Sequence, residues 1–175
     1  MEAGFRIVPA RREHLRAVSA IEHAAATLFP REDLPEHLRH RVTSREVLDE
    51  ARADGRLWIA LDRGQRPAGF ALAEALATEA WLDEVDVHPL YMRRGIGTRL
   101  VETAVEWARQ QGHAALFLLT FRHLPWNAAF YERLGFEQLR NDALGPALLH
   151  ILEEERRAGI DVAKRVGMRR WIGRG

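Results

Sequence analysis

The sequence has 175 residues, 47% of them hydrophobic, and its 26 basic residues nearly balance its 25 acidic ones. A chain of this size folds around one core, so we expect a single domain over residues 1–175. The formal charge of +1 gives no general attraction for nucleic acid or an anionic membrane, and the absence of cysteine excludes disulfides, cysteine metal ligands and thiol nucleophiles.

The first half of the chain is predicted to alternate between strands and helices. Residues 5–10 alternate in polarity and meet a proline, as a strand does at its end, and residues 11–29 carry apolar side chains at helical intervals. The charged segment 30–43 contains two prolines and predicts a loop with a helical turn. Ser44 can cap a short helix that ends at Gly55. Two strands joined by a hairpin turn follow.

The second half contains a predicted strand, glycine turn, helix and strand in direct succession. We expect a strand over 81–89, an amphipathic helix from Gly97 to Gly112, and a nearly continuous apolar strand over 114–121. A short helix, a short strand, a charged helix and a last strand complete the chain. The sum is an α/β (α+β) domain in which one βαβ unit lies among mostly antiparallel strands with flanking helices.

The expected location follows from what the chain lacks. No apolar run reaches the roughly 18 residues that cross a bilayer. Residues 1–14 also lack the apolar segment of a signal peptide. We therefore expect a cytoplasmic protein without a membrane partner.

The stretch HPLYMRRGIGTRL joins the strand to the helix through a basic, glycine-containing turn. Such a turn directs free backbone N–H groups and the positive end of the helix dipole toward one point, which suits phosphate. Gly95 and Gly97 let the main chain approach the phosphate oxygens, while Arg93, Arg94 and Arg99 add charge. The alternative is an ordinary surface turn. A P-loop and a dinucleotide fingerprint do not match, which argues against ATP and NAD.

Residues 85–112, followed by NAAFYERLGF at 127–136, resemble the GNAT superfamily of N-acetyltransferases. The hallmark of that family is [QR]-x-x-G-x-[GA] between its fourth strand and third helix. The resemblance is strong over 80–140 and implies a mixed, mostly antiparallel sheet around a βαβ cofactor-binding core. In this family the turn holds the pyrophosphate of acetyl-CoA through backbone amides, so the resemblance implies acetyl-CoA as co-substrate and no metal.

The resemblance assigns cofactor contacts to the turn and to the strand before it. The strand backbone is implied to pair with the pantetheine arm, and an amide there to polarise the thioester carbonyl. The implied cofactor-binding residues are Val85, Asp86, Val87, Arg93, Arg94, Gly95, Ile96, Gly97, Thr98 and Asn127. Met92 departs from the family's Gln or Arg, and Leu124 stands where the family has its asparagine. Asn127 is either a CoA contact or only an N-cap.

Acetyl transfer to an amine needs a base for the ammonium and an acid for the leaving thiolate. Tyr131 matches the family tyrosine that reaches the sulfur, and its phenol, with a reference pKa of about 10, is a suitable acid. Packing in the core is the alternative role for this ring. We choose Glu84 as the base, with Asp83 or a water chain as alternatives. Neighbours on a strand point to opposite sides, so Asp83 and Glu84 cannot both serve without a bulge.

We expect acceptor specificity to come from one loop and from residues near the end of the apolar strand: 27–43, Thr120, Phe121 and Trp126. Phe29 would add to the pocket wall, with core packing as the alternative for these aromatic rings. Glu32 and Asp33 are candidates for holding a cationic amine, with solvated loop charges as the alternative. His88 precedes a proline and is assigned a structural role. His123 is either part of the acceptor pocket or a solvated loop residue.

The leading hypothesis is an acetyl-CoA-dependent N-acetyltransferase that acts on a primary amine of a small molecule or peptide. The alternative is a CoA-binding regulatory module that keeps the turn but has lost the chemistry, and the presence of Tyr131 counts against it. A DNA-binding protein is the third hypothesis, and the near-neutral charge argues against it. We expect no nucleic-acid partner, and a homodimer is compatible with the family.

Overall fold

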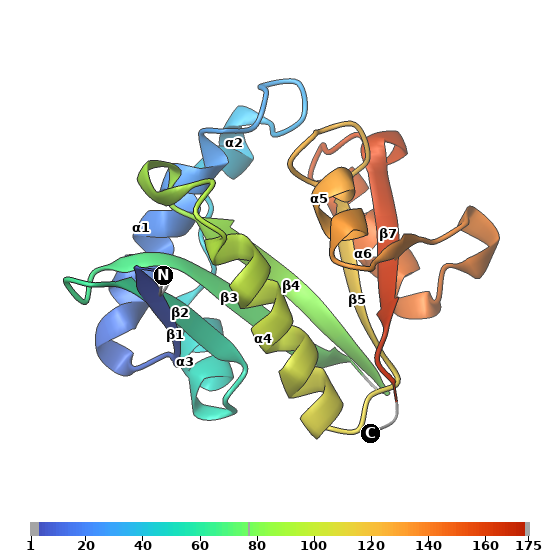
Figure 1. Cartoon of the computed structure of the whole chain (residues 1–175). Coiled ribbons are helices and arrows are strands. Elements are labelled where there is room, and N and C mark those ends of the chain that lie inside the picture. Colours follow the sequence, from blue (N-terminus) through green and yellow to red (C-terminus); the bar gives the residue numbers. More distant parts are fainter. Residues whose placement is uncertain (1–3, 77, 174–175) are drawn as a thin grey trace.

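The computed structural model describes residues 4–76 and 78–173, which form one sheet with helices on both faces (Figure 1). The strands are β1 (Phe5–Pro9), β2 (Leu57–Asp62), β3 (Pro67–Leu76), β4 (Glu79–Val87), β5 (Ala115–Phe121), β6 (Glu137–Gln138) and β7 (Arg165–Trp171). The α-helices are α1 (Leu15–Ala26), α2 (Glu36–Arg39), α3 (Arg45–Ala53), α4 (Ile96–Gln110), α5 (Ala128–Arg133) and α6 (Pro146–Arg157). The predicted elements are present, with boundaries that differ by a few residues.

The strand order is β1-β2-β3-β4-β5-β7-β6, and every neighbouring pair except β4 and β5 is antiparallel. Strands β4 and β5 run parallel because α4 crosses over between them, which is the predicted βαβ unit. They pair only at Ala80–Leu116 and Trp81–Phe117 and then separate. From Leu82 onward, the side of β4 that faces β5 has no strand partner in the described part of the chain.

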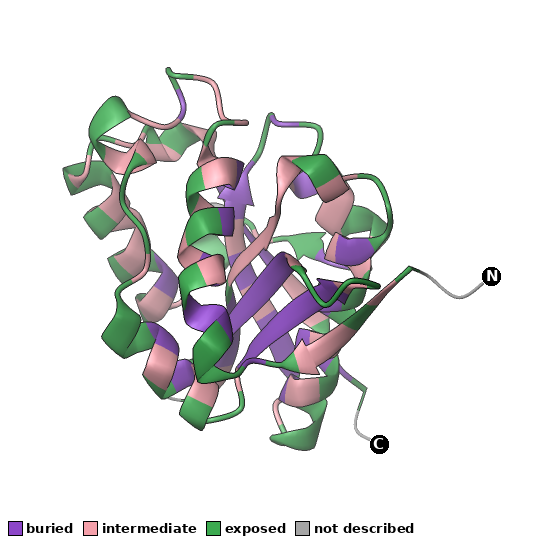
Figure 2. Cartoon of the chain, turned by 90° about the vertical axis from the view of Figure 1, so that its left-hand side faces the viewer, coloured by how far each residue is buried: buried purple, intermediate pink, exposed green. Residues whose placement is uncertain are grey.

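One face of the sheet is covered by α4 and α5. The buried side chains of α4 form the predicted apolar stripe, made of Ile96, Leu100, Val101, Ala104, Val105 and Ala108. This stripe belongs to a core cluster with Ala71 and Leu82 from the sheet, against which Phe130 and Tyr131 of α5 also pack. The buried residues concentrate on the sheet and on the sides of the helices that face it (Figure 2). This core fixes the start of α4 relative to α5.

The other face carries α1, α3 and α6. Helices α1 and α3 bury Val18, Ile21 and Leu48 against β2 and β3, and Ser44 caps α3 by accepting a hydrogen bond from the Val47 N–H, as predicted. Helix α6 packs closely on β7, where a Cβ at Gly167 would overlap a methyl carbon of Leu148. No helix among residues 4–76 and 78–173 is long and apolar enough to span a membrane.

Candidate active site

A β-bulge in β4 decides which side chains face the candidate site. Ala73 of β3 pairs with Leu82, and Leu72 pairs with Glu84, so Asp83 is an extra residue between them. Leu82 lies in the core under α4, and after the bulge Val85 and Val87 pack against that same core. Glu84 and Asp86 therefore turn to the face that α1 covers. The strand therefore contains a bulge at Asp83, and without a bulge Asp83 and Glu84 would point to opposite faces.

The turn before α4 has an unusual backbone. Arg93 and Gly95 both have positive φ angles, 59° and 77°, and Gly95 is the N-cap residue of α4. Within the described residues, none of the backbone N–H groups from Arg93 to Thr98 donates a hydrogen bond to the protein. Free amides in such a turn, together with the positive end of a 15-residue helix, form a site that favours an anion.

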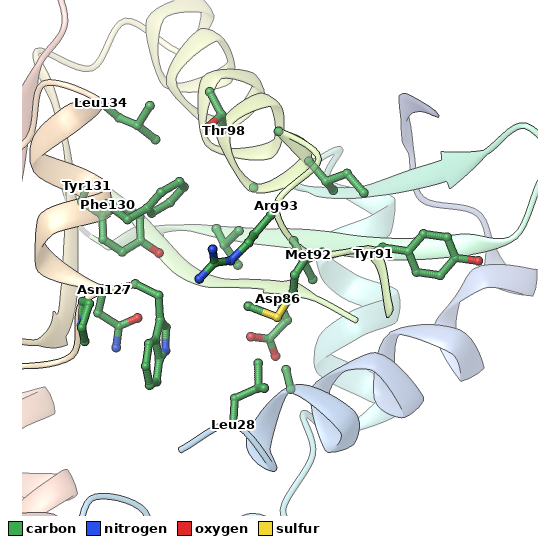
Figure 3. A pocket seen from close by; sticks show the side chains of 18 of the residues that line it. Leu28, Asp86, Tyr91, Met92, Arg93, Thr98, Asn127, Phe130, Tyr131 and Leu134 are labelled. Atoms are coloured by element: carbon green, nitrogen blue, oxygen red, sulfur yellow. The ribbon is translucent and has the colours of Figure 1, made fainter. Parts of the chain in front are cut away.

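The three arginines of the turn are directed to different places. Arg94 donates to the Leu90 carbonyl at 3.3 Å, and Arg99 donates to the Phe5 carbonyl at 2.8 Å. Only the Arg93 side chain, among these three, points into the cavity (Figure 3). Gly97 is needed for close packing, since a Cβ there would lie 3.3 Å from the ring of Phe130. In this structure Arg94 and Arg99 bind backbone carbonyls, and a contact of their guanidinium groups with the anion stays a prediction.

A cavity of about 770 Å³ opens between the turn, β4, α5 and the end of α1. Its size is within the range of small-molecule sites. The lining includes most predicted cofactor residues: Val85, Asp86, Val87, Arg93, Gly95, Ile96, Gly97, Thr98 and Asn127. Arg94 is the predicted cofactor residue that does not line it. The free edge of β4 and the free amides of the turn thus meet in one space.

Tyr131 and Asp86 lie across this cavity from each other, with the hydroxyl of Tyr131 directed inward (Figure 3). The Tyr131 ring packs edge-on against Phe130 and Phe136, at centroid distances of 5.0 and 5.7 Å. The pKa of the Tyr131 phenol is raised above its usual value, mainly by burial and to a smaller extent by the negative charge of Asp86. Its proton therefore stays on the oxygen throughout the neutral range. The ring therefore packs in the core while its hydroxyl reaches the cavity, and the donor role stays a prediction.

The carboxyl groups of Glu84 and Asp86 are hydrogen-bonded to each other, which requires that the pair hold a proton. Burial raises the pKa of Asp86 to about 7, and Glu22 adds to this shift. Burial and the Asp86 charge raise the pKa of Glu84 well above its usual range. At neutral pH the shared proton is therefore on Glu84, and Asp86 is the group that titrates. Asp86 lines the cavity, whereas Glu84 lies behind it.

Two further carboxyl groups surround this pair. Glu22 of α1 accepts hydrogen bonds from the Thr43 N–H, at 2.9 Å to each oxygen, and burial raises its pKa. Asp83 lies on the bulge and is partly exposed. Its pKa is nevertheless raised to about 6, mainly by desolvation and to a smaller extent by the negative charge of Glu74. In the described part of the chain, neither the Glu84–Asp86 pair nor these two carboxyl groups have an arginine or lysine within ion-pair distance. The nearby Arg56 forms ion pairs with Glu50 and Asp54 instead.

Several predicted acceptor residues have structural partners instead. Asp33 is buried and accepts hydrogen bonds from His123 Nε2 at 2.8 Å and Lys164 Nζ at 2.7 Å. Burial alone would raise the pKa of Asp33, but these hydrogen bonds outweigh it and the net shift is downward. Asp33 therefore joins the 27–43 loop to the loop after β5 and to the turn before β7, and it is not free to hold an amine. His88 accepts a hydrogen bond from the Leu90 N–H, which is the structural role expected of it.

Other predicted residues do reach the cavity. Asn127 is the N-cap residue of α5, but its side chain makes no capping hydrogen bond and lines the cavity. Phe29 and Trp126 also line it, whereas Thr120 and Phe121 are buried beside it. Leu28 belongs to the predicted 27–43 segment, whereas the lining residues that sequence reasoning did not single out are Ala25, Tyr91, Pro125, Arg133 and Leu134. Their proximity depends on helix packing and has no local sequence signal.

Comparisons with known proteins agree with this architecture. The sequence profile of the acetyltransferase (GNAT) family matches residues 18–136, which is more than half of the chain. The [Ribosomal protein bS18]-alanine N-acetyltransferase of Escherichia coli strain K12 is 32% identical over 78 residues, which cover 45% of this chain and 53% of that protein. The matched region spans about half the length of this curated relative.

Solved structures extend the similarity over almost the whole chain. N-acetylglutamate synthase from Neisseria gonorrhoeae, in complex with coenzyme A and N-acetyl-glutamate, has a TM-score of 0.74 at 20% identity and covers 99% of this chain and 36% of its own. The ribosomal-protein-S18-alanine N-acetyltransferase from Escherichia coli has a TM-score of 0.66 at 23% identity. The match covers 97% of this chain and 94% of that protein. At these identities the similarity concerns the fold.

Proposed function

Since the chain belongs to the acetyltransferase (GNAT) family, a family of acyltransferases, we propose that it transfers an acetyl group from acetyl-CoA to a primary amine of a small molecule or peptide. One observation carries the proposal: the free amides of residues 93–98 open into the same cavity as the Tyr131 hydroxyl and the Asp86 carboxyl. Anion binding and acid–base groups therefore share one space. A surface turn without function would not need this combination.

The residues of the turn fit a diphosphate. Free N–H groups from Arg93 to Thr98 would bind the phosphate oxygens, and the Arg93 guanidinium would add positive charge. This binding does not require the polar side chain that the family has at the position of Met92. The free edge of β4 around Val85–Val87 offers backbone groups to an extended pantetheine arm. When bound, acetyl-CoA supplies an activated thioester. An amide that polarises its carbonyl contributes typically about 3 kcal/mol to the rate.

The Glu84–Asp86 pair supplies the base. Asp86 faces the cavity and has its pKa near 7, so its carboxylate can take a proton from the incoming ammonium. Glu84, the base expected from the sequence, acts behind it by holding the shared proton and keeping Asp86 ionised. The carboxylates without cationic partners also attract the positively charged amine.

Tyr131 supplies the acid. Its raised pKa keeps the phenol protonated, and its hydroxyl is directed into the cavity from the α5 side. A phenol in this place donates a hydrogen bond to the leaving thiolate and then its proton. As the amide forms, its nitrogen loses a second proton, which the remaining phenolate takes, so the products are neutral and the phenol is restored. Asn127, with its side chain free of a capping role, is positioned to contact the same arm of the co-substrate.

The proposed acceptor is a primary amine, and the names of the relatives suggest which classes of amine to test. Their names include an alanine of a ribosomal protein and the amino-acid product N-acetyl-glutamate. A test panel therefore contains L-glutamate, phenethylamine and the tripeptide Ala-Gly-Gly. Release of the CoA thiol is followed for the wild-type protein and for Tyr131→Phe, which removes only the hydroxyl. We expect turnover on at least one amine and a loss of kcat of about tenfold to 100-fold in Tyr131→Phe.

Calorimetry with CoA separates the alternatives. Binding of CoA together with turnover supports the enzyme. Binding without turnover on the panel favours the regulatory module, and the absence of binding contradicts both. Equal rates for the wild type and Tyr131→Phe would remove the phenol from the mechanism while leaving the transferase activity in place.

A further inference from the structure

A line of hydrogen-bonding groups leads from the cavity to the loop before α3. Asp86, on the cavity wall, is hydrogen-bonded to Glu84. Glu84 Oε2 lies 3.4 Å from the hydroxyl oxygen of Thr43, and that hydroxyl lies 3.0 Å from Glu22 Oε1. A hydroxyl has one hydrogen and two lone pairs, so Thr43 can donate to one carboxyl while it accepts from the other.

We propose that Glu84, Thr43 and Glu22 form a side-chain relay that carries the acceptor's proton from Asp86 out of the cavity. The inference rests on the proposed function, because it assigns the exit route of the proton that the transfer reaction releases. Asp86 is the catalytic residue that touches the amine. The other three residues act through it and are positioning residues.

The proton balance of the relay is simple. Asp86 takes one proton from the ammonium, which leaves the neutral amine. Glu84 passes its own proton to the Thr43 oxygen while the Thr43 hydroxyl gives its hydrogen to Glu22. Asp86 then returns its proton to Glu84, and Glu22 releases one to water. The net result is one proton moved from the amine to solvent, with the Glu84–Asp86 pair again holding a single proton.

The relay solves a problem of access. When both substrates fill the cavity, Asp86 faces the substrates and not bulk water. Thr43 lies between the exposed residues Val42 and Ser44, and Glu22 is only partly buried. The far end of the line therefore reaches solvent through a surface that the substrates do not occupy. The Thr43 N–H holds Glu22 in position independently of the hydroxyl.

Other charged groups near the line affect it without belonging to it. Asp83 and Glu22 act on Glu84 through their charge, and Glu74 and Arg56 act on Asp83 in the same way. Across the cavity lie the Tyr131 phenol and the Arg93 side chain, and Arg165 acts on the Tyr131 phenol through its charge. In the described part of the chain, none of these groups makes a side-chain hydrogen bond to Glu84 or Asp86.

The test compares Thr43→Val with Thr43→Ser in the full chain. Valine removes the hydroxyl but keeps the backbone N–H that binds Glu22, and serine restores the hydroxyl. With acetyl-CoA and the tripeptide Ala-Gly-Gly at pH 7, we expect Thr43→Val to lower kcat about tenfold, with KM for the amine within about twofold. Thr43→Ser should recover the rate.

The pH profile separates a relay from a structural role. The α-amine of Ala-Gly-Gly has a pKa of about 8, and phenethylamine, an alkylamine, has one of about 10. Above its own pKa an amine arrives without the extra proton and needs no relay. At pH 9 the defect of Thr43→Val should therefore disappear for the tripeptide and persist for phenethylamine. A defect that is equal at every pH, is absent, or is shared by Thr43→Ser overturns the relay.

A second measurement keeps the relay testable if no amine is turned over. Carbon-13 NMR follows the titration of the carboxyl groups in protein labelled at Asp and Glu, without any substrate. We expect Glu22, Glu84 and Asp86 to titrate as a coupled set in the wild type and in Thr43→Ser. In Thr43→Val the Glu22 carboxyl loses the hydroxyl hydrogen bond that lowers its pKa, so we expect it to titrate at higher pH while its coupling through charge remains. An unchanged titration in Thr43→Val overturns the relay, whereas failure of turnover alone concerns the proposed function.

Discussion

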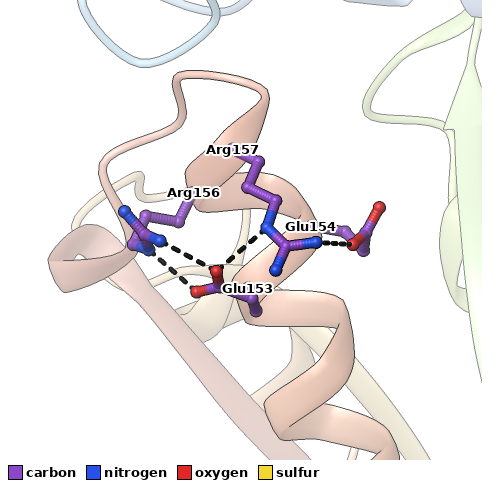
Figure 4. Close-up of polar contacts among 4 residues, drawn as sticks. All are labelled: Glu153, Glu154, Arg156 and Arg157. Atoms are coloured by element: carbon purple, nitrogen blue, oxygen red, sulfur yellow. Dashed lines mark hydrogen bonds and ion pairs between the residues drawn. The ribbon is translucent and has the colours of Figure 1, made fainter.

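Carboxyl groups meet opposite surroundings in two regions of this protein. The acidic region consists of Glu22, Asp83, Glu84 and Asp86, where burial raises every pKa and like charges add to the shifts of the last three. The arginine-paired region consists of α6 and β7, where glutamates meet arginines. There Glu153 binds Arg156 and Arg157, and the hydrogen bond from Arg156 lowers the pKa of Glu153 to about 2 (Figure 4).

The difference shows that acidic residues are not placed by composition alone. The chain has enough arginine to pair its carboxylates, and it does so at Glu153 and at Glu155, which binds Arg165 at 2.7 Å through both oxygens. At the end of β4 the pairing is withheld, although unpaired carboxylates destabilise the fold. Perturbed groups of this kind concentrate at functional sites. We therefore interpret the acidic region as functional and the arginine-paired region as structural.

The largest expected effect is on catalysis in the acidic region. Asp86→Asn removes the carboxylate that faces the cavity, so we expect kcat to fall about 100-fold or more. In the wild type, kcat/KM should rise with pH through about 7, as Asp86 loses its proton, and this rise should be absent in the variant. The measurement is thiol release over pH 5–10. Retained activity with the same pH profile would place the base elsewhere.

The next effect is on stability in the arginine-paired region. Glu155 and Arg165 are both largely buried, with 18% and 12% of their side chains exposed, and Arg165 lies over the ring of Phe121. Glu155→Gln leaves the guanidinium without its anionic partner, which should lower the free energy of unfolding by about 2–3 kcal/mol. Urea denaturation at pH 7 measures it. A change below 0.5 kcal/mol, on the order of a surface pair, would contradict the assigned structural role.

A smaller change in the free energy of unfolding, this time an increase, is expected when one carboxylate of the acidic region is neutralised. The folded pKa of Asp86, about 7, lies above its unfolded value, so ionisation costs stability as the pH rises from about 4 to 7. Asp86→Asn should therefore raise the free energy of unfolding by about 1–2 kcal/mol at pH 8 and by little at pH 4. Thermal unfolding at the two pH values checks this. A variant less stable at pH 8 would mean that the carboxylate has a stabilising partner.

The smallest effect is expected at the surface of α6. Glu153→Gln removes an exposed pair, which contributes little to stability in water, and leaves the cavity unchanged. Because the folded pKa lies below the unfolded one, any loss should appear above pH 4.5 and vanish as the pH falls toward 2. Activity should equal that of the wild type. Reduced activity would show that α6 affects the site.

Local features of the fold follow from the sequence. Helix α4, its apolar stripe, its glycine start and the buried strand β5 are each encoded within one stretch of chain, and so is the Ser44 cap. The anion-binding turn is predictable for the same reason, since backbone N–H groups at a helix start need no distant partner. The alternation of strand residues says only that Asp83 and Glu84 cannot share a face without a bulge, and the bulge itself is seen in the structure.

The tertiary structure alone decided which side chains meet. Asp33 binds His123 and Lys164, 90 and 131 residues away, and Glu22 comes from α1 to lie beside Glu84. Such contacts depend on how helices and strands pack, and no local periodicity contains them. The sequence by itself determined the family, the order of elements and the glycine turn that we propose binds phosphate, because these depend on local properties of the chain. The packing of α1 and α5 around the separated strands decided which carboxylate faces the cavity.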